Sequence, residues 1–355
     1  MKFTEGYWSI KKGITPLFAV EYAGSRIYGD ELVVYAPAKH IAHRGDRLNL
    51  GMLTVCLSSP MEDVIKVSVR HFEGTAYQGP FAQINQTSPR VTIEETDESI
   101  IYQSGSAKAV IDKRPNSWGI RFLDGDRELT NTGFRNMAHM ENHVDGKNYM
   151  VEQLALDVDE YVYGLGERFT PFVKNGQTVD MWNEDGGTSS EIAYKNIPFY
   201  ITNKGYGVLL DNEGDASYEI ASEKVERVQF SVEGERLDYY VINGHTPKGT
   251  ISKYTELTGK PALPPAWSFG LWLSTSFTTD YDEETTGSFI QGMADRDIPL
   301  HVFHFDCYWM EAYEWCNFTW DPETFPGPKG MLKRYHDKGL RICVWINPDT
   351  DSKSF

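Results

Sequence analysis

The stretch that decides the fold runs from residue 300 to residue 310 and reads LHVFHFDCYWM. Apolar and aromatic residues fill its first half, as in a buried β-strand, and the run stops at Asp306. Two more apolar runs flank it, and a helical pattern separates each pair of runs, so that the five segments are 267–273, 282–296, 300–305, 328–339 and 340–346. Alternation of strand and helix predicts parallel strands joined by helical crossovers.

The three predicted strands end in polar and aromatic residues: STSF at 274–277, DCYW at 306–309 and INPD at 346–349. The carboxyl ends of parallel strands meet at one edge of a sheet, and the loops that follow them converge on one opening. We therefore expect the Asp306 carboxylate to accept hydrogen bonds in a pocket that the neighbouring rings line. An aspartate after a strand can also simply cap the next turn, and the sequence leaves this alternative open.

Residues before about 246 follow a different pattern, with short alternating runs between Gly, Asn and Asp turns. Segments 63–72 and 225–232 are typical of half-buried antiparallel strands, and many such strands predict a β-sandwich. A helix predicted over 247–259 and the extended connector PALPP at 261–265 mark the change. We therefore expect two domains, an amino-terminal β-sandwich at 1–245 and an α/β domain at 246–355.

Composition excludes several function classes. The 355 residues include 51 acidic and 34 basic side chains, and the net charge of −17 disfavours binding to nucleic acid or to anionic membranes. The first residues lack the apolar core of a signal peptide, and no later run has the ~18 apolar residues of a membrane span. The four cysteines are scattered, which argues against a disulfide framework. We expect a cytoplasmic protein with no nucleic-acid or membrane partner.

Motifs for metal and nucleotide chemistry are weak. HMENH at 139–143 has two histidines at helical spacing, but its glutamate is misplaced for the HExxH pattern, so no metal site is expected there. His301 and His304 lie three apart on a predicted strand and therefore point to opposite faces. YGLGER at 163–168 has no third glycine and no helix after it, which argues against a dinucleotide loop. Neither a metal nor a cofactor is indicated.

Four segments together resemble glycoside hydrolase family 31, in particular its bacterial α-xylosidases. They are YGLGERFTPFVKNGQTVDMWNEDGGTSSEIAYKNIPFYIT (163–202), PALPPAWSFGLWLSTSFTTDYDE (261–283), PLHVFHFDCYWM (299–310) and RICVWINP (341–348). The resemblance implies a β-sandwich ahead of a (β/α)8 TIM barrel, and cleavage of α-glycosidic bonds with retention by two aspartates. The fold class expected is thus multidomain β plus α/β, in agreement with the periodicity.

The resemblance also implies roles for residues at the strand ends. Asp306 would bind hydroxyl groups of the innermost sugar, and Phe277 and Trp345 would form the walls of that subsite. Family α-xylosidases tend to have Cys-Phe where α-glucosidases have Ile-Asp, and this chain has Cys307-Tyr308. A ring in place of an acid removes a partner for the hydroxymethyl group of glucose and fills its space, which favours xylose.

Two more residues join this set of candidates. Trp315 would form a platform for the leaving sugar. Asp185, in the glycine-rich segment WNEDGGTSS, would reach the pocket from the first domain, although a solvent-exposed loop acid is nearly as good an interpretation. The expected ligand is a small carbohydrate, an α-xyloside or a xyloglucan oligosaccharide, and the resemblance also makes a homo-oligomer an expectation.

The barrel expected from the resemblance is incomplete. The 110 residues from 246 to 355 supply roughly three of the eight units of a barrel that has ~250 residues. In the family, the nucleophile lies in a later motif of the type KTDFGE and the acid/base aspartate lies later still, and neither motif occurs in this chain. We expect both catalytic residues after Phe355 and the 355-residue chain alone to be inactive. An α-glucosidase of the same family and a non-catalytic carbohydrate-binding fragment remain the alternatives.

Overall fold

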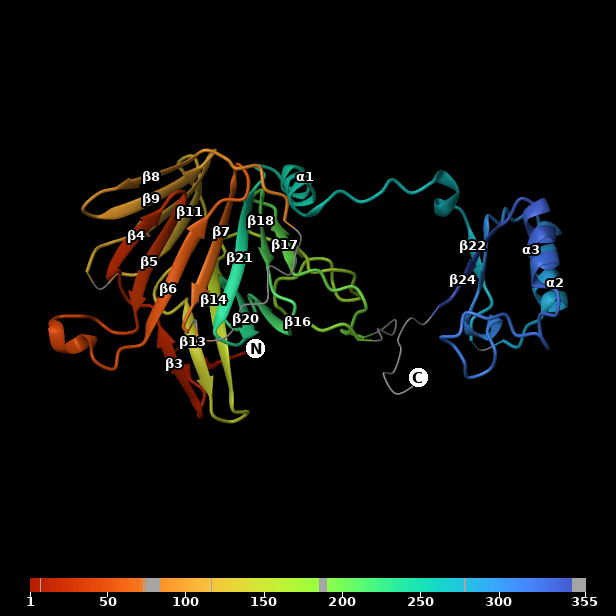
Figure 1. Cartoon of the computed structure of the whole chain (residues 1–355), viewed down its shortest axis with the longest axis horizontal. Helices are drawn as coiled ribbons and strands as arrows, with labels where there is room; N and C mark the ends of the chain where they lie inside the picture. The colour runs from red at the N-terminus through yellow and green to blue at the C-terminus, as the bar shows by residue number, and fades with distance from the viewer. Residues whose placement is uncertain are drawn as a thin grey trace. The chain divides into compact units, whose positions relative to one another are not determined.

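The computed structural model describes residues 1–6, 8–72, 74, 84–115, 117–184, 190–277 and 279–346. The chain divides into two compact units, Met1–Pro261 and Ala262–Phe355 (Figure 1). The first is built almost entirely from antiparallel strands and the second from parallel strands and helices. No described helix is long and apolar enough to cross a membrane.

Three antiparallel sheets form most of the first unit within the described residues, and a short pair, β1 (Thr4–Glu5) and β2 (Ser9–Ile10), adds to them. The eight-stranded sheet has the order β15 (Val162–Gly164), β17 (Phe199–Thr202), β18 (Tyr206–Leu210), β21 (Arg236–Asn243), β7 (Val64–Arg70), β6 (Met52–Ser58), β5 (Glu31–Pro37) and β4 (Gly24–Tyr28). The six-stranded sheet has the order β16 (Gln177–Met181), β19 (Ala216–Ile220), β20 (Arg227–Glu233), β14 (Lys147–Ala155), β13 (Ala138–Asn142) and β3 (Ile14–Phe18). The five-stranded sheet has the order β12 (Arg127–Thr132), β11 (Ile120–Asp124), β10 (Ala107–Asp112), β9 (Ser99–Ser104) and β8 (Val91–Glu95).

One apolar core joins these three sheets. Strands such as β6 alternate buried and partly exposed residues, so that Leu53, Val55 and Leu57 all point into the core. The same cluster contains Phe122 from the five-stranded sheet and Phe230 from the six-stranded sheet. The predicted β-sandwich is therefore confirmed, with the sheets packed face to face over shared side chains.

The strands β7 and β20 differ from the expected half-buried pattern because both of their faces are covered. On β7, Ser68 is buried as deeply as its valine neighbours, and its hydroxyl donates a hydrogen bond to Asp238 on β21. Lys66 lies 3.3 Å from the same aspartate. Polar side chains in these positions are paired with one another, which makes their burial tolerable.

The helix α1 (Pro247–Thr258) forms where the sequence predicts a helix, with Pro247 at its start and Thr246 as its cap. It packs on the first unit, because Leu257 is fully buried there and the Tyr254 ring stacks on Phe199 at 3.9 Å. The compact first unit therefore extends to Pro261, beyond the domain end expected at residue 245.

The second unit follows the predicted strand–helix alternation, with shorter strands. Its elements are a one-turn 3-10 helix η2 (Ala266–Phe269), β22 (Trp272–Ser274), α2 (Glu283–Ala294), β23 (Val302–Phe305), a second 3-10 turn η3 (Cys307–Trp309), α3 (Pro328–Asp337) and β24 (Arg341–Val344). A further 3-10 turn, η1 (Arg44–Arg47), belongs to the first unit. The strand predicted at 267–273 is wrong in its first half, because η2 occupies those residues. Both long helices lie on the same side of the small sheet (Figure 1).

Candidate functional site

The three strands of the second unit are parallel and pair in the order β22, β23, β24. Their ends are tied to one another by hydrogen bonds. The backbone N–H of Asp306 donates to the Thr275 hydroxyl at 3.0 Å, and the N–H of Trp345 donates to the carbonyl of Phe305 at 2.7 Å. The residues that follow the three strands therefore lie along one edge of the sheet, as the sequence predicts.

Alternating side chains on β23 explain why this strand is at the centre. Phe303 and Phe305 are fully buried on the helical side, where both lie against Tyr335 of α3. On the other face, His304 Nδ1 lies 2.8 Å from the Ser274 hydroxyl. His301 instead accepts a hydrogen bond from the N–H of Leu271. The two histidines therefore have separate hydrogen-bond partners.

Asp306 ends β23 by capping the turn that follows. Its Oδ1 accepts a hydrogen bond from the N–H of Cys307 at 2.7 Å, which starts η3. This oxygen therefore caps the next turn, which is the alternative role that the sequence left open. The side chain is only half-buried, so capping leaves the carboxylate accessible to a ligand. A role in sugar binding remains a prediction.

The turn η3 fixes Cys307 and Tyr308 in opposite environments. Cys307 is buried, and burial together with the Asp306 carboxylate raises the pKa of its thiol to about 11, so the thiol stays protonated at neutral pH. The Tyr308 ring is 38% exposed. Its centroid lies 6.4 Å from Trp315, which in turn meets Trp345 edge to face at 6.4 Å. The structure thus brings three of the predicted rings together.

Two predicted site residues do not join this group. Phe277 is 65% exposed, and among the described residues no hydrogen bond or ring contact links it to Asp306 or Trp345. Asp185 lies outside the described residues. The proposed positions of these two side chains at the sugar therefore stay predictions.

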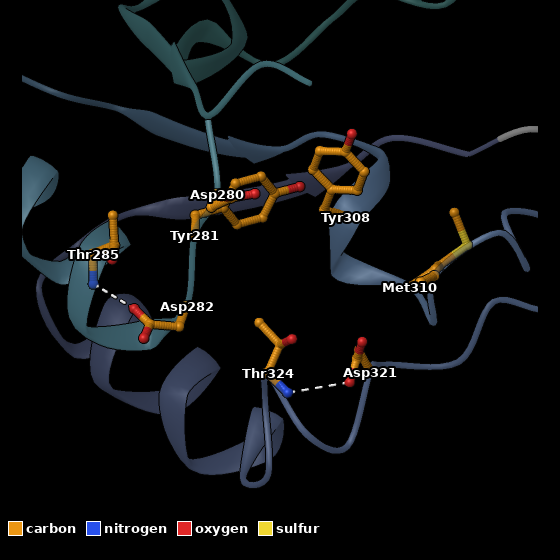
Figure 2. A pocket seen from close by; sticks show the side chains of 9 residues that line it. Asp280, Tyr281, Asp282, Thr285, Tyr308, Met310, Asp321 and Thr324 are labelled. Carbon is orange, nitrogen blue, oxygen red and sulfur yellow. Dashed lines mark hydrogen bonds between the residues drawn. The ribbon is translucent and has the colours of Figure 1, made fainter. Parts of the chain in front are cut away.

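A pocket of about 440 Å³ opens beside Tyr308 (Figure 2). Among the described members of the predicted set, Tyr308 alone lines this pocket. The lining residues are Asp280, Tyr281, Asp282, Thr285, Tyr308, Met310, Ala312, Asp321 and Thr324. Two of its three aspartates are tied to the backbone: Asp282 accepts from the N–H of Thr285 at 2.8 Å, and Asp321 accepts from the N–H of Thr324 at 3.1 Å. That backbone N–H lowers the pKa of Asp282, which is therefore ionised and unsuited to donating a proton.

Two residues that position Asp306 were not predicted from the sequence. The hydroxyl of Tyr281 donates a 2.6 Å hydrogen bond to the Asp306 carbonyl, and its ring lies 6.2 Å from that of Tyr308. Thr275 accepts from the Asp306 N–H on the other side. Both residues lie in the segment STSFTTDYDE at the end of the first strand, where a tyrosine between two aspartates was the available signal.

Potential metal ligands cluster elsewhere. Among the described residues, groups of three or more His, Cys, Asp or Glu at metal-binding distances occur only in the first unit, at His71, His139 and Glu235. The strand-end site of the second unit therefore offers hydroxyl-binding and stacking groups. Such a set is suited to a neutral polyhydroxylated ligand.

Comparisons with known proteins agree with both units. The glycosyl hydrolase 31 N-terminal galactose mutarotase-like domain matches residues 54–219, and the glycosyl hydrolases family 31 TIM-barrel domain matches residues 261–354. The incomplete barrel predicted from the sequence is thus confirmed as part of that domain.

Full-length relatives extend the comparison. The alpha-xylosidase XylQ of Lactiplantibacillus pentosus is 51% identical over 354 residues, which cover 100% of this chain and 46% of the relative. An alpha-xylosidase of Emericella nidulans is 43% identical over 98% of this chain and 47% of the relative. The chain spans about half the length of these curated relatives.

A solved structure, the family 31 dextranase of Flavobacterium johnsoniae, superposes with a TM-score of 0.76 at 22% identity, over 92% of this chain and 38% of that one. At this identity the likeness concerns the fold alone. The two matched domains and the full-chain identity to XylQ lead to one conclusion: the chain belongs to glycoside hydrolase family 31.

Proposed function

We propose that this chain forms part of a retaining α-xylosidase that removes non-reducing terminal α-xylosyl residues from xyloglucan-type oligosaccharides and other α-xylosides. The observation that carries the proposal is the 51% and 43% identity, over nearly the whole chain, to two proteins named as alpha-xylosidases. A small carbohydrate is accordingly the proposed ligand, and homo-oligomerisation remains a prediction.

The site at the strand ends supports this assignment. Asp306 would accept hydrogen bonds from sugar hydroxyls. Trp315, which lies beside Tyr308, and Trp345, which lies beside Trp315, would offer apolar ring faces. The Tyr308 ring would occupy the space that the hydroxymethyl group of glucose requires. A pentose lacks that group, so the ring discriminates by volume and by the absence of a carboxylate partner.

The bond-breaking residues are proposed to lie outside these 355 residues. Retaining hydrolysis requires two carboxyl groups about 5 Å apart, one attacking the anomeric carbon and one protonating the leaving oxygen. No KTDFGE-type motif occurs in these residues. Asp306, Asp282 and Asp321 each accept a backbone N–H, at the start of η3, at the start of α2 and in a turn, respectively. The chain contributes sugar binding, and the 355-residue chain alone is expected to be inactive.

Two assays test the proposal. The enzyme encoded by the gene read beyond codon 355 should release xylose from an aryl α-xyloside much faster than glucose from the matching α-glucoside. Preference for the glucoside would reject the substrate and favour an α-glucosidase. The 355-residue chain should give no turnover above background, and measurable turnover would contradict the position proposed for the catalytic pair.

A further inference from the structure

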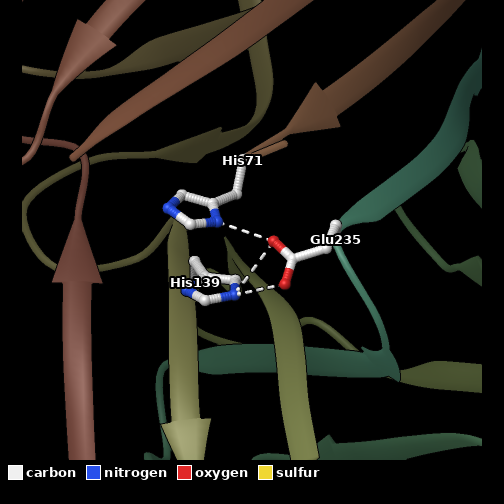
Figure 3. Close-up of side chains that lie close together, drawn as sticks. All are labelled: His71, His139 and Glu235. Carbon is white, nitrogen blue, oxygen red and sulfur yellow. Dashed lines mark hydrogen bonds and ion pairs between the residues drawn. The ribbon is translucent and has the colours of Figure 1, made fainter. Parts of the chain in front are cut away.

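Three potential metal ligands meet in the first unit, far along the chain from one another (Figure 3). His71 Nδ1 lies 2.6 Å from Glu235 Oε2, and His139 Nε2 lies 3.2 Å from both oxygens of that carboxylate. The two imidazole rings stack with their centroids 3.8 Å apart. One donor atom from each of the three residues falls within 4.8 Å of the other two.

The backbone holds these residues together independently of their side chains. His71 directly follows β7, and Glu235 lies in the turn that leads from β20 into β21. The N–H of His71 donates to the Glu235 carbonyl at 2.9 Å, which extends the β7–β21 pairing. His139 lies on β13, in the other sheet. The cluster thus bridges the eight-stranded and the six-stranded sheets.

The three ligand atoms of this cluster favour one class of metal ion. Two imidazole nitrogens and one carboxylate oxygen suit Zn²⁺ and similar transition metals, whereas Mg²⁺ and Ca²⁺ prefer oxygen ligands throughout. The Asn148 side chain donates a 2.7 Å hydrogen bond to Glu235 Oε1 and so orients the carboxylate from outside the cluster.

We propose that His71, His139 and Glu235 form a binding site for a divalent transition-metal ion of the Zn²⁺ class, which clamps the two sheets together. The site is independent of sugar hydrolysis. The ion takes the place of the ring hydrogens that face Glu235, and each neutral ring moves its hydrogen to its other nitrogen. For His139 that other nitrogen, Nδ1, is buried with no hydrogen-bond partner in the described part of the chain. The shift gives up the hydrogen bond of this ring to Glu235, which bonds to the ion replace, and it leaves the Nδ1 hydrogen buried without an acceptor among the described residues.

Binding requires one ring to leave the stack, because two stacked imidazoles 3.8 Å apart point their in-plane lone pairs in nearly parallel directions. Two nitrogens on one Zn²⁺ ion, each ~2.0–2.1 Å from it, lie at most ~4.2 Å apart, and the donor atoms here are all within 4.8 Å of one another. His139 is fully buried, whereas the side chain of His71 is partly exposed, so His71 is the ring that moves when its hydrogen bond to Glu235 is exchanged for the ion. The exposed side of His71 and Glu235 leaves room for water as the remaining ligand.

Zinc binding by the untagged 355-residue chain tests the proposal. After treatment with a chelator and dialysis, the wild-type chain should bind Zn²⁺ by titration calorimetry, with a raised melting temperature, and Co²⁺ in its place should show visible ligand-field absorption. His71→Gln should lower the affinity by roughly tenfold or more, because even residues beyond the ligands cost that much. The same variant should lose the rise in melting temperature.

Controls separate this site from others. His143→Gln changes an exposed histidine of the same segment that contacts Thr15 instead, and it should leave the titration unchanged. Glu235→Gln is a second ligand variant in case His71→Gln fails to fold, and circular dichroism checks both. A wild-type chain that binds no zinc, or equal binding by wild type and both ligand variants, would overturn the proposal.

Discussion

The hydroxyl of Tyr281 donates a 2.6 Å hydrogen bond to the main-chain carbonyl of Asp306. This bond ties the loop after β22 to the end of β23, next to the turn that carries Tyr308. Burial raises the pKa of Tyr281, so its hydroxyl remains a donor at every physiological pH. The position of the candidate sugar-binding carboxylate thus depends on a side chain from the preceding loop.

Tyr281→Phe should destabilise the second unit by about 1 kcal/mol, because it removes the shorter of the two hydrogen bonds to the Asp306 carbonyl and leaves only the Trp309 N–H at 3.3 Å. Urea unfolding followed by tryptophan fluorescence reports on this unit, since six of the nine tryptophans lie in it. Tyr313→Phe, at a tyrosine that is almost fully exposed, is the matched control and should leave the midpoint unchanged. Equal midpoints for Tyr281→Phe and wild type would argue against a positioning role.

Two substitutions at Asp306 separate capping from sugar binding. Asparagine caps a turn about as well as aspartate, so Asp306→Asn should retain wild-type stability, whereas Asp306→Ala should lose about 1 kcal/mol. In the full-length enzyme, both variants should lose roughly tenfold to hundredfold in kcat/KM, since a hydrogen bond to a charged group contributes about 1.5–3 kcal/mol. Full activity of Asp306→Asn would leave capping as the only function of this carboxylate.

Tyr308 is the proposed determinant of sugar size. Tyr308→Asp in the full-length enzyme should raise the ratio of α-glucosidase to α-xylosidase activity, because it restores space and a carboxylate partner for the hydroxymethyl group. Tyr308→Phe keeps the ring and should keep the xyloside preference. Parallel kinetics with aryl α-xyloside and α-glucoside measure the ratio, and an unchanged ratio in Tyr308→Asp would remove this residue from the specificity argument.

Glu152 should make the first unit less stable as the pH rises. It is fully buried on β14, where its Oε2 accepts a 3.2 Å hydrogen bond from Tyr239 of the opposite sheet, and burial raises its pKa to about 8 from an ordinary 4.5. Between these two values the unfolded chain has lost the proton and the folded chain keeps it. The free energy of unfolding should therefore fall by up to ~1.4 kcal/mol per pH unit in that window and level off above it.

Urea unfolding at several pH values between 5 and 8 measures this dependence. Glu152→Gln is uncharged in both states, so its stability should change less with pH than that of wild type, and the two should differ most near pH 8. Glu213→Gln, at an exposed glutamate, should follow the wild-type curve. Parallel curves for wild type and Glu152→Gln would show that Glu152 is ionised in the folded protein.

Local patterns predicted α1 and most elements of the second unit well. Pro247 and Gly259 bracket α1, and the apolar run before Asp306 becomes β23, because capping residues and periodicity act within a few positions. The strand predicted at 267–273 was wrong in its first half. The aromatic residues there are typical of a strand, but they form the 3-10 turn η2. Packing of α1 on the first unit was not predictable, because its partner Phe199 lies about fifty positions earlier.

Contacts between residues far apart in the sequence were the features that could not be predicted. His139 lies on the strand β13, so its spacing of four residues from His143 does not place the two rings on one face of a helix. The ring that stacks on His139 is that of His71, which follows β7 in the other sheet. Gly166 of the YGLGER segment has a positive φ, and a β-carbon there would lie 2.0 Å from the Lys195 carbonyl. This glycine therefore permits a close approach of two backbone segments, which a sequence motif alone does not reveal.

The pairing of β7 with β21 has a consequence for synthesis of the protein. These strands are the central pair of the eight-stranded sheet, and Val64 lies opposite Ile242. The ribosome must therefore synthesise almost the entire first unit before the hydrogen bonds between β7 and β21 can form. Until then, β4 to β7 form at most a four-stranded antiparallel sheet in which β7 is an unpaired edge strand. Nascent chains of this protein should thus need protection by chaperones until residue 243 has left the exit tunnel.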